Sequence, residues 1–340
     1  MNKYVVITTI NEPTEGIRLF LDTDFKVVIV GDEKTPDVYH DLDVAFLDVA
    51  TQRNMFPELS DLIPYNHYCR KNLGYLYAIS KGADLILDTD DDNFFDMDSL
   101  MQIDSEVEGV KISSNRKWIN VYSLFSKSTV WPRGLPLDEI HSGEITVSER
   151  VNLFCPIQQY LVNGDPDVDA VFRLVFNDQN IVFNREHDDV ILNKGNWCPF
   201  NSQATIFFKE AFPLLYLPTT VLSRVTDIWR SFVAQATLWK HDYELIFRKP
   251  IAQQKRNFHN LIDDLKEEFT GFLRNNDLIE TLERSGDKEI HNQIISISET
   301  ASYYLSVLVR DGFLKSKENL SSKLWHKGLN EAFSESRTVN

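Results

Sequence analysis

The chain runs Leu85-Ile86-Leu87-Asp88-Thr89-Asp90-Asp91-Asp92, a short apolar segment followed at once by a cluster of aspartates. The apolar part, within residues 83–87, predicts a buried strand. Adjacent carboxylates repel one another and cost folding energy unless a cation or a set of hydrogen-bond donors neutralises them. Mg²⁺ and Mn²⁺ favour carboxylate oxygens, and open α/β sheets bind ligands at strand ends. The segment therefore predicts a divalent metal site beside a phosphorylated or nucleotide substrate.

Predicted strands and helices alternate up to this segment. The expected strands are residues 4–10, 25–30, 45–49 and 83–87, and the expected helices are residues 14–21 and 65–81. Such alternation is typical of an α/β fold with a parallel sheet covered by helices. The stretch 118–251 is mixed and contains one helix at 226–240. Beyond it we expect helices at 261–273, 277–284 and 288–309, and a polar, loosely ordered end at 315–340.

The composition bounds the class of protein. Of the 340 residues, 43% are hydrophobic and 12% aromatic, which is typical of a packed globular chain. A formal charge of −16 disfavours nonspecific binding to nucleic acid and to anionic membrane surfaces. Cys69, Cys155 and Cys198 form no CxxC pair, so neither a zinc site nor a disulfide framework is expected. Because no signal peptide and no transmembrane segment is recognisable, we expect a cytoplasmic protein.

Known aspartate motifs narrow the chemistry of the cluster. An EF-hand loop starting at Asp88 would need glycine at Asn93 and glutamate at Ser99, so this match fails. An aspartyl-phosphate phosphatase would normally have threonine or valine at Asp92, so this match is poor. The arrangement that remains is the DxD motif of nucleotide-sugar enzymes, in which carboxylates hold a metal against a diphosphate.

Three further stretches carry a resemblance to a known family. They are Pro64-Tyr65-Asn66-His67-Tyr68-Cys69-Arg70-Lys71-Asn72-Leu73-Gly74-Tyr75-Leu76-Tyr77-Ala78-Ile79, Trp131-Pro132-Arg133-Gly134-Leu135-Pro136-Leu137 and Pro166-Asp167-Val168-Asp169-Ala170-Val171-Phe172, with Asn201-Ser202 and Asp227-Ile228-Trp229-Arg230 downstream. The chain resembles STELLO-type glycosyltransferases over about residues 4–260. It is more distantly similar to the reversibly glycosylated polypeptides, which act as UDP-arabinopyranose mutases and share the Asp-Asp-Asp run and a later Asp-Ala-Val.

Both families imply a GT-A fold, in which a Rossmann-like nucleotide-binding half and an acceptor half surround one central sheet. The resemblance implies a catalytic domain at 1–257, divided near residue 100, and a C-terminal helical region at 258–340. GT-A enzymes often add a late histidine to the metal ligands. Here the corresponding stretch, 249–256, contains none, and His241 and His259 lie on either side of it. Plant STELLO proteins are membrane-anchored, and that setting is not carried over to this chain.

The acidic loop is expected to hold the metal of the donor. Asp90 and Asp92 are the predicted metal and ribose ligands, with Asp88 and Asp91 as supporting carboxylates. Other residues expected to bind the donor are Thr8, Thr9, Glu12, Asp32, Arg70, Lys71, Trp131, Arg133 and Arg256. Among them, Asp32 could accept a hydrogen bond from uracil, and Arg70 and Lys71 could grip the diphosphate. The alternatives are ordinary polar turns, salt bridges to the acidic loop, and a rigid structural turn at Trp-Pro-Arg-Gly.

The acceptor half offers three candidate catalytic residues, which are Asp227, Arg230 and Asp169. Asp227 is predicted to open the helix 228–240, where it could deprotonate the acceptor hydroxyl or simply cap the helix. Arg230, one turn further along, could pair with Asp227. Asp167 and Asp169 lie before a predicted apolar strand, where they could bind sugar hydroxyls or be solvated.

The resemblance therefore implies a metal-dependent glycosyltransferase. It would move a sugar from a nucleotide-diphospho-sugar, with UDP expected, to a carbohydrate or glycolipid acceptor, with Mn²⁺ or Mg²⁺ as cofactor. A UDP-sugar mutase acting at the same donor site and a non-catalytic binding or assembly protein remain alternatives. The sugar, the acceptor, the stereochemical outcome and any oligomerisation stay open.

Overall fold

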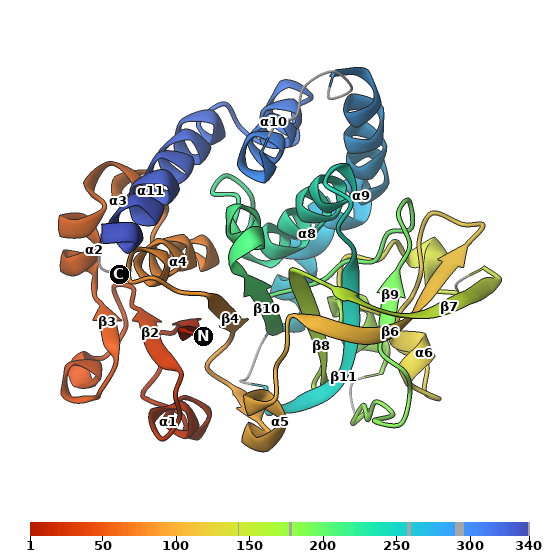
Figure 1. Cartoon of the computed structure of the whole chain (residues 1–340), viewed down its shortest axis with the longest axis horizontal. Helices are drawn as coiled ribbons and strands as arrows, with labels where there is room; N and C mark the ends of the chain where they lie inside the picture. Colours follow the sequence, from red (N-terminus) through yellow and green to blue (C-terminus); the bar gives the residue numbers. More distant parts are fainter. Residues whose placement is uncertain (142, 177–178, 257–259, 290–295, 339–340) are drawn as a thin grey trace.

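The computed structural model describes residues 1–141, 143–176, 179–256, 260–289 and 296–338, and these residues form one large sheet flanked by helices (Figure 1). The strands are β1 (Lys3–Thr8), β2 (Lys26–Val30), β3 (Ala45–Leu47), β4 (Leu85–Thr89), β5 (Asn93–Phe95), β6 (Glu106–Ser114), β7 (Ile145–Phe154), β8 (Ile157–Gly164), β9 (Val190–Leu192), β10 (Ala204–Phe208) and β11 (Leu245–Gln254). The α-helices are α1 (Glu15–Leu21), α2 (Val49–Met55), α3 (Pro57–Leu62), α4 (Lys71–Ser80), α5 (Met97–Met101), α6 (Tyr122–Phe125), α7 (Ala170–Val175), α8 (Ser223–Lys240), α9 (Leu261–Glu289), α10 (Ile297–Arg310) and α11 (Glu318–Thr338). Short 3-10 helices are η1 (Asp37–Asp41), η2 (Tyr68–Arg70), η3 (Leu137–Glu139) and η4 (Lys209–Leu215).

The strand order within the described residues is β3-β2-β1-β4-β10-β8-β11-β9-β6-β7, with β5 paired to β11. Strands β3, β2, β1 and β4 are parallel, whereas β4 pairs with β10 in the antiparallel direction. The expected α/β fold around one central sheet is therefore confirmed. The chain leaves β1 for β2 on one side and returns to β4 on the other, which makes a topological switch point beside β1.

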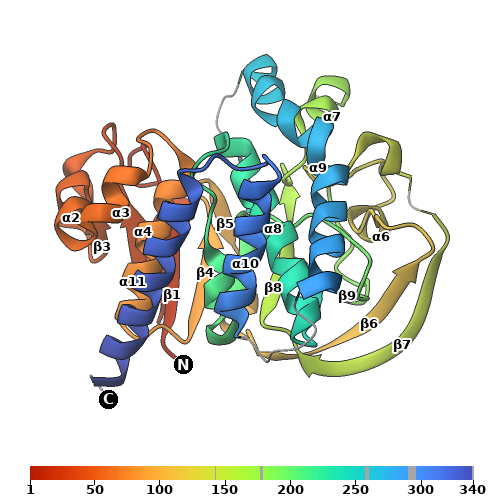
Figure 2. The ribbon, with the colours of Figure 1, turned by 90° about the horizontal axis from the view of Figure 1, so that it is seen from above.

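Alternating residues of the central strands face two different cores. In β1, Tyr4 and Val6 pack in the core beneath α4, α8, α9, α10 and α11, whereas Val5 and Ile7 pack with α1 and α5 on the opposite face. Figure 2 shows the five helices lying over the same face. Because both faces of these strands are buried, their sequences read as continuous apolar runs. This explains why the strands were recognisable from sequence.

The C-terminal part differs from the sequence prediction in two ways. One continuous helix, α9, replaces the two helices predicted over residues 261–284. The side chain of Asn275, at its centre, accepts a hydrogen bond from Trp229 Nε1 (2.9 Å) and donates one to the Gly134 carbonyl (2.7 Å). Because these distant partners occupy it, the side chain does not compete for the backbone hydrogen bonds of the helix. The predicted loose end is wrong, because residues 318–338 form helix α11, which packs along α4 (Figure 2). The predicted domain boundary falls on residues 257–259, which lie outside the described residues.

Helix α11 hides its apolar stripe against the rest of the chain. Trp325, Leu329 and Ala332 are buried, and Gly328 lies so close to α4 that a Cβ there would stand 3.1 Å from Leu76 Cδ1. The spacing of these residues is that of one helical face, which a mainly polar composition obscured.

His326 of α11 gives the fold a measurable pH dependence. Its Nδ1 lies 2.9 Å from Ser298 Oγ, its buried Nε2 has no partner among the described residues, and burial lowers the pKa of His326 from 6.5 to about 4. Between these pH values the unfolded chain binds a proton that the folded chain does not. We therefore expect the free energy of unfolding to fall as the pH drops from 6.5 to 4, with a share from His326 that approaches ~1.4 kcal/mol per pH unit.

Denaturant unfolding of the wild type and His326→Gln across this pH range measures that share. The plots of unfolding free energy against pH for these two proteins should converge as the pH falls. The plot for a variant of the exposed His141 (His141→Gln) should instead run parallel to that of the wild type. Parallel curves for His326→Gln would contradict the assignment.

Candidate active site

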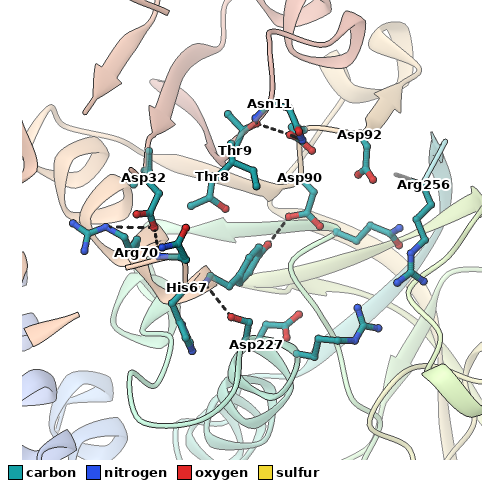
Figure 3. A pocket seen from close by; sticks show the side chains of 18 of the residues that line it. Thr8, Thr9, Asn11, Asp32, His67, Arg70, Asp90, Asp92, Asp227 and Arg256 are labelled. Atoms are coloured by element: carbon teal, nitrogen blue, oxygen red, sulfur yellow. Dashed lines mark hydrogen bonds and ion pairs between the residues drawn. The ribbon is translucent and has the colours of Figure 1, made fainter. Parts of the chain in front are cut away.

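A cavity of about 550 Å³ lies at the carboxyl ends of β1, β2 and β4 (Figure 3). Of the predicted site residues, those that line it are Thr8, Thr9, Asp32, Arg70, Asp90, Asp91, Asp92, Arg133, Asp167, Asp227 and Arg256. The cavity coincides with the switch point of the sheet, where open α/β folds bind ligands, and its volume is that of a small-molecule site. Residues from both halves of the chain therefore meet at one place.

Three carboxylates of the acidic loop line the cavity, and Figure 3 labels two of them, Asp90 and Asp92. Asp90 Oδ1 accepts a hydrogen bond from the Tyr68 hydroxyl (2.5 Å), and Asp92 Oδ1 accepts one from Gln254 Nε2 (2.9 Å). Each carboxylate is thus oriented by a neutral donor from another part of the chain.

The third carboxylate of the loop, Asp91, is turned toward the segment after β1. It accepts hydrogen bonds from Thr9 Oγ1 (2.5 Å) and Asn11 Nδ2 (2.9 Å), and its own carbonyl accepts one from Thr14 Oγ1. These contacts tie the acidic loop to the loop after β1 across the switch point. Asp91 therefore fits the supporting role predicted for it.

Asp90 and Asp92 form a pair that suits a divalent cation. Burial and the charge of Asp92 raise the pKa of Asp90 to about 7, although Lys71 and Tyr68 favour its charged form. Within the described residues, no three His, Cys, Asp or Glu side chains make up a complete ligand set. Mg²⁺ is commonly held by only one or two carboxylates, with substrate phosphates and water in the other positions. The pair fits such a shared site.

Asp88, Lys71 and Arg230 form a buried ion cluster behind the acidic loop. Asp88 lies 2.8 Å from both Lys71 Nζ and Arg230 Nη1, and all three side chains are at most 1% exposed. Burial alone would raise the pKa of Asp88, but the two cations outweigh it and lower the pKa. None of the three lines the cavity, so the predicted contact of Lys71 with the diphosphate and the predicted catalytic position of Arg230 are corrected to a place behind the cavity, where Asp88 was predicted to act as a supporting carboxylate. Asp88 points this way because it shares a strand face with Ile86, beneath α4 and α8.

Most of the residues predicted to bind the nucleoside lie together in the cavity wall. Asp32 lies in the cavity wall, and its two oxygens accept hydrogen bonds from the backbone of Glu33 (2.8 Å) and Asn66 (2.7 Å). Thr8 and Thr9 lie beside it at the end of β1 (Figure 3). Glu12 is exposed and does not line the cavity, so its predicted contact with the nucleoside is not supported by the geometry.

Arg70 uses most of its donors in hydrogen bonds within the protein. It is buried, and it donates to Gln52 Oε1 (2.9 Å), the Ile63 carbonyl (3.2 Å) and Ser60 Oγ (3.2 Å). Its Nε lies 4.0 Å from Asp32 Oδ2. The salt bridge expected between this basic pair and the acidic loop is made by Lys71, 3.6 Å from Asp90, and not by Arg70.

Arg133 joins two carboxylates in the acceptor half of the cavity. Its guanidinium donates to Asp167 (2.8 and 2.7 Å) and to Asp227 (3.1 and 2.8 Å). Helix α8 begins at Ser223, so Asp227 lies one turn inside it and the predicted cap at Asp227 is wrong. The predicted pairing of Asp227 with Arg230 is also wrong, because Arg230 is drawn to the buried Asp88.

Trp131 and Asp169 stand behind the cavity wall. Trp131 Nε1 donates to Asp169 Oδ2 (2.6 Å), and Asp169 Oδ1 caps helix α7 by accepting from the Phe172 N–H (2.7 Å). Both side chains are buried and neither lines the cavity, which corrects the predicted contacts with the sugar. The predicted strand after Asp169 is a helix. Gly134, with φ +90, allows the turn that buries Trp131 and presents Arg133, because a Cβ there would stand 2.4 Å from Ile228.

Several cavity residues were not predicted from the sequence. They are, among others, Asn11, Lys34, His67, Tyr68, Arg173, Gln203, Arg224, Gln254, Asp264 and Glu267. Tyr68 lies within a stretch that carried the resemblance, and Gln254 is the last residue of β11, so both could have been proposed. Arg173 and Arg224 carry no local signal. Of the two histidines considered as late ligands, His241 contacts Thr300 (2.9 Å) away from the cavity, and His259 lies outside the described residues.

Comparison with known proteins identifies the relatives. The chain is 31% identical over 286 residues to the probable glycosyltransferase STELLO2 of Arabidopsis thaliana, and 33% identical over 287 residues to the probable glycosyltransferase STELLO1 of the same plant. The chain is STELLO-like. Each match covers 74% of this chain but 37% of the STELLO protein, so the chain spans little more than a third of its relatives. No family model matches the chain.

The STELLO resemblance inferred from the sequence motifs is thus confirmed. Among the described residues, no helix of this STELLO-like chain is both long and apolar enough to cross a membrane.

Proposed function

We propose that the chain is a metal-dependent glycosyltransferase that transfers a sugar from a nucleotide-diphospho-sugar, with UDP as the expected nucleotide, to a carbohydrate or glycolipid acceptor. The observation that carries this proposal is the pair Asp90 and Asp92 in the wall of the switch-point cavity. The printed names of the two relatives, both probable glycosyltransferases, support the same reaction class.

Asp90 and Asp92 would hold Mn²⁺ or Mg²⁺ together with the donor diphosphate. The bound cation would act as a Lewis acid that neutralises charge on the departing nucleotide. Tyr68 and Gln254 keep the two carboxylates in place through their hydrogen bonds. Arg256, which lines the same cavity, supplies a guanidinium for the diphosphate side (Figure 3).

Asp32, Thr8 and Thr9 would bind the nucleoside. Each oxygen of Asp32 already accepts one backbone hydrogen bond and retains acceptor capacity for a base N–H. The short parallel strands β1 and β2 hold these residues side by side.

Asp227 would orient the acceptor. Both of its oxygens accept hydrogen bonds from Arg133, and Oδ2 also accepts one from the Ser202 N–H (3.2 Å). Taking up a proton would break part of this network. The geometry therefore favours the orienting part of the predicted role over that of a free general base.

Calorimetric titration of UDP, GDP and CMP, first with Mn²⁺ and then with EDTA, tests the donor site. We expect UDP to bind with Mn²⁺ and its affinity to fall at least about tenfold with EDTA, because the diphosphate would lose its cation. Tighter binding of another nucleotide would keep the mechanism and change the donor. Absence of binding under both conditions would remove the proposal and favour a non-catalytic protein.

The product distinguishes transfer from isomerisation. A sugar found on an added acceptor supports the transferase, whereas a ring-isomerised sugar still attached to UDP would identify a mutase.

A further inference from the structure

A second cavity of about 170 Å³ adjoins the proposed active site. Arg173 and Arg256 line both cavities, so these two side chains form the wall between them. The rest of its described lining has an apolar side, made of Val168, Phe172, Phe176, Ile181 and Leu261, and a polar side that includes Asp165 and Gln179. A cavity with guanidinium groups at its mouth and an apolar side suits a ligand with an anionic group beside an apolar one.

Arg173 makes two hydrogen bonds and leaves one buried donor unpaired within the described residues. Its Nη1 donates to Asp165 Oδ1 (3.1 Å) and its Nη2 to the Pro166 carbonyl (2.8 Å), while its Nε is buried and has no hydrogen-bond partner among the described residues. The side chain is only 13% exposed. A buried N–H without an acceptor carries a free-energy penalty that a ligand oxygen would relieve.

Arg224 and Arg256 bring two more positive charges close to Arg173. Arg224 lies 2.6 Å from Glu268 and 3.8 Å from Asp264, and Arg256 lies 2.6 Å from the same Asp264. Burial, followed by the charges of Arg173 and Arg224, lowers the pKa of Arg256 to about 10, in spite of Asp264 and Asp167. Burial is thus the main cause of the lowered pKa, and the carboxylates of Asp264 and Asp167 counter part of the repulsion from the other two guanidinium groups.

The position of this cluster separates it from the acidic loop. Asp90 and Asp92 follow β4, whereas Arg173 belongs to α7 and Arg224 to α8, in the half of the chain assigned to the acceptor. A neutral sugar would gain little from three partly buried guanidinium groups, whose desolvation is costly. An oxyanion that accepts from two of them would gain charge-assisted hydrogen bonds.

We propose that Arg173, which lies beside Arg256 of the diphosphate side, binds an anionic group of the acceptor, either a carboxylate or a phosphate, with an adjacent apolar part in the second cavity. The inference rests on the proposed transferase function, because it assigns the acceptor to the cavity that would also hold the donor.

Calorimetry with three matched probes tests the inference. The protein is first saturated with UDP and Mn²⁺, and then titrated with phenyl phosphate, phenyl β-D-glucuronide and the neutral phenyl β-D-glucoside. We expect at least one anionic probe to bind about 10- to 100-fold more tightly than the glucoside, from charge-assisted hydrogen bonds. The stronger of the two identifies the group as phosphate or carboxylate.

Arg173→Gln should remove this preference and leave the affinity for UDP within about twofold of the wild type, since only the acceptor end changes. Arg150→Gln is the matched control, because Arg150 on β7 is a half-exposed arginine that pairs with Glu108 and Asp188. It should alter neither affinity.

The outcomes separate this inference from the function on which it rests. Normal UDP binding with no preference for anions, or with a preference that survives Arg173→Gln, overturns the acceptor assignment alone. Anionic probes that bind only when UDP is absent would place the arginine cluster in the donor site, and this result would also overturn the acceptor assignment. Failure of UDP to bind at all would overturn the proposed function together with this inference.

Discussion

Asp92→Asn is expected to lower turnover of the nucleotide-sugar at least about a hundredfold while leaving the fold intact. The substitution removes a negative charge from the wall of the cavity without changing the size of the side chain. An asparagine oxygen can still accept the hydrogen bond that Gln254 Nε2 now donates to Asp92 Oδ1. The loss should therefore reflect the cation and the diphosphate, not disorder of the loop.

Release of UDP from UDP-sugars in the presence of Mn²⁺ measures this effect, and thermal unfolding checks the fold. Asp188→Asn is a control, because Asp188 is a partly exposed aspartate paired with Arg150 far along the sheet. Asp91→Asn should cost less than Asp92→Asn, since Asp91 is turned to Thr9 and Asn11. Turnover close to that of the wild type in Asp92→Asn would remove the metal argument.

Asp88→Asn is expected to cost about 3–5 kcal/mol of unfolding free energy, because it breaks a buried ion cluster from one side. Lys71 and Arg230 would each lose a carboxylate partner at 2.8 Å and remain as two buried cations. The side chain of Asp88 is 0% exposed, so water cannot replace the lost charge. The acidic loop, which starts two residues further on, would lose its support at the same time.

Denaturant unfolding measures the loss. Glu108→Gln provides the comparison, because it removes one partner of an exposed pair with Arg150 (2.8 Å) and should change stability by at most about 1 kcal/mol. The double variant Asp88→Asn with Arg230→Met should lose less than the sum of its two single variants. A loss below about 1 kcal/mol in Asp88→Asn would contradict the proposed support of the loop.

The sequence predicted the central strands and the place of the acidic loop because these depend on local patterns. Residues such as Val5, Val6 and Ile7 are buried on alternate faces of the sheet, and an apolar run reports that directly. The loop after β4 follows from the end of such a run. The edge of the sheet where the cavity lies could therefore be foreseen.

The partners of individual charges could not be foreseen, because they are set by packing between distant segments. Asp227 and Arg230 are three residues apart on one helix, a spacing that favours a mutual pair. In the folded chain Asp227 instead pairs with Arg133, and Arg230 pairs with Asp88, across sequence separations of 94 and 142 residues. Trp131 and Asp169 were misplaced for a similar reason, since a turn and a helix cap bury them against each other.

The packing of α11 along α4 has a consequence for how the chain is made. Helix α4 carries Lys71, which supports Asp88, and its outer face holds Leu76 against Gly328 of α11. On a growing polypeptide, α4 is complete long before α11 exists, so this face has no cover from α11 while the segments between the two helices are being synthesised. Contacts between such remote segments form slowly, and an exposed apolar face invites aggregation in the meantime. Helix α4 therefore depends for its final burial on a helix that is synthesised much later.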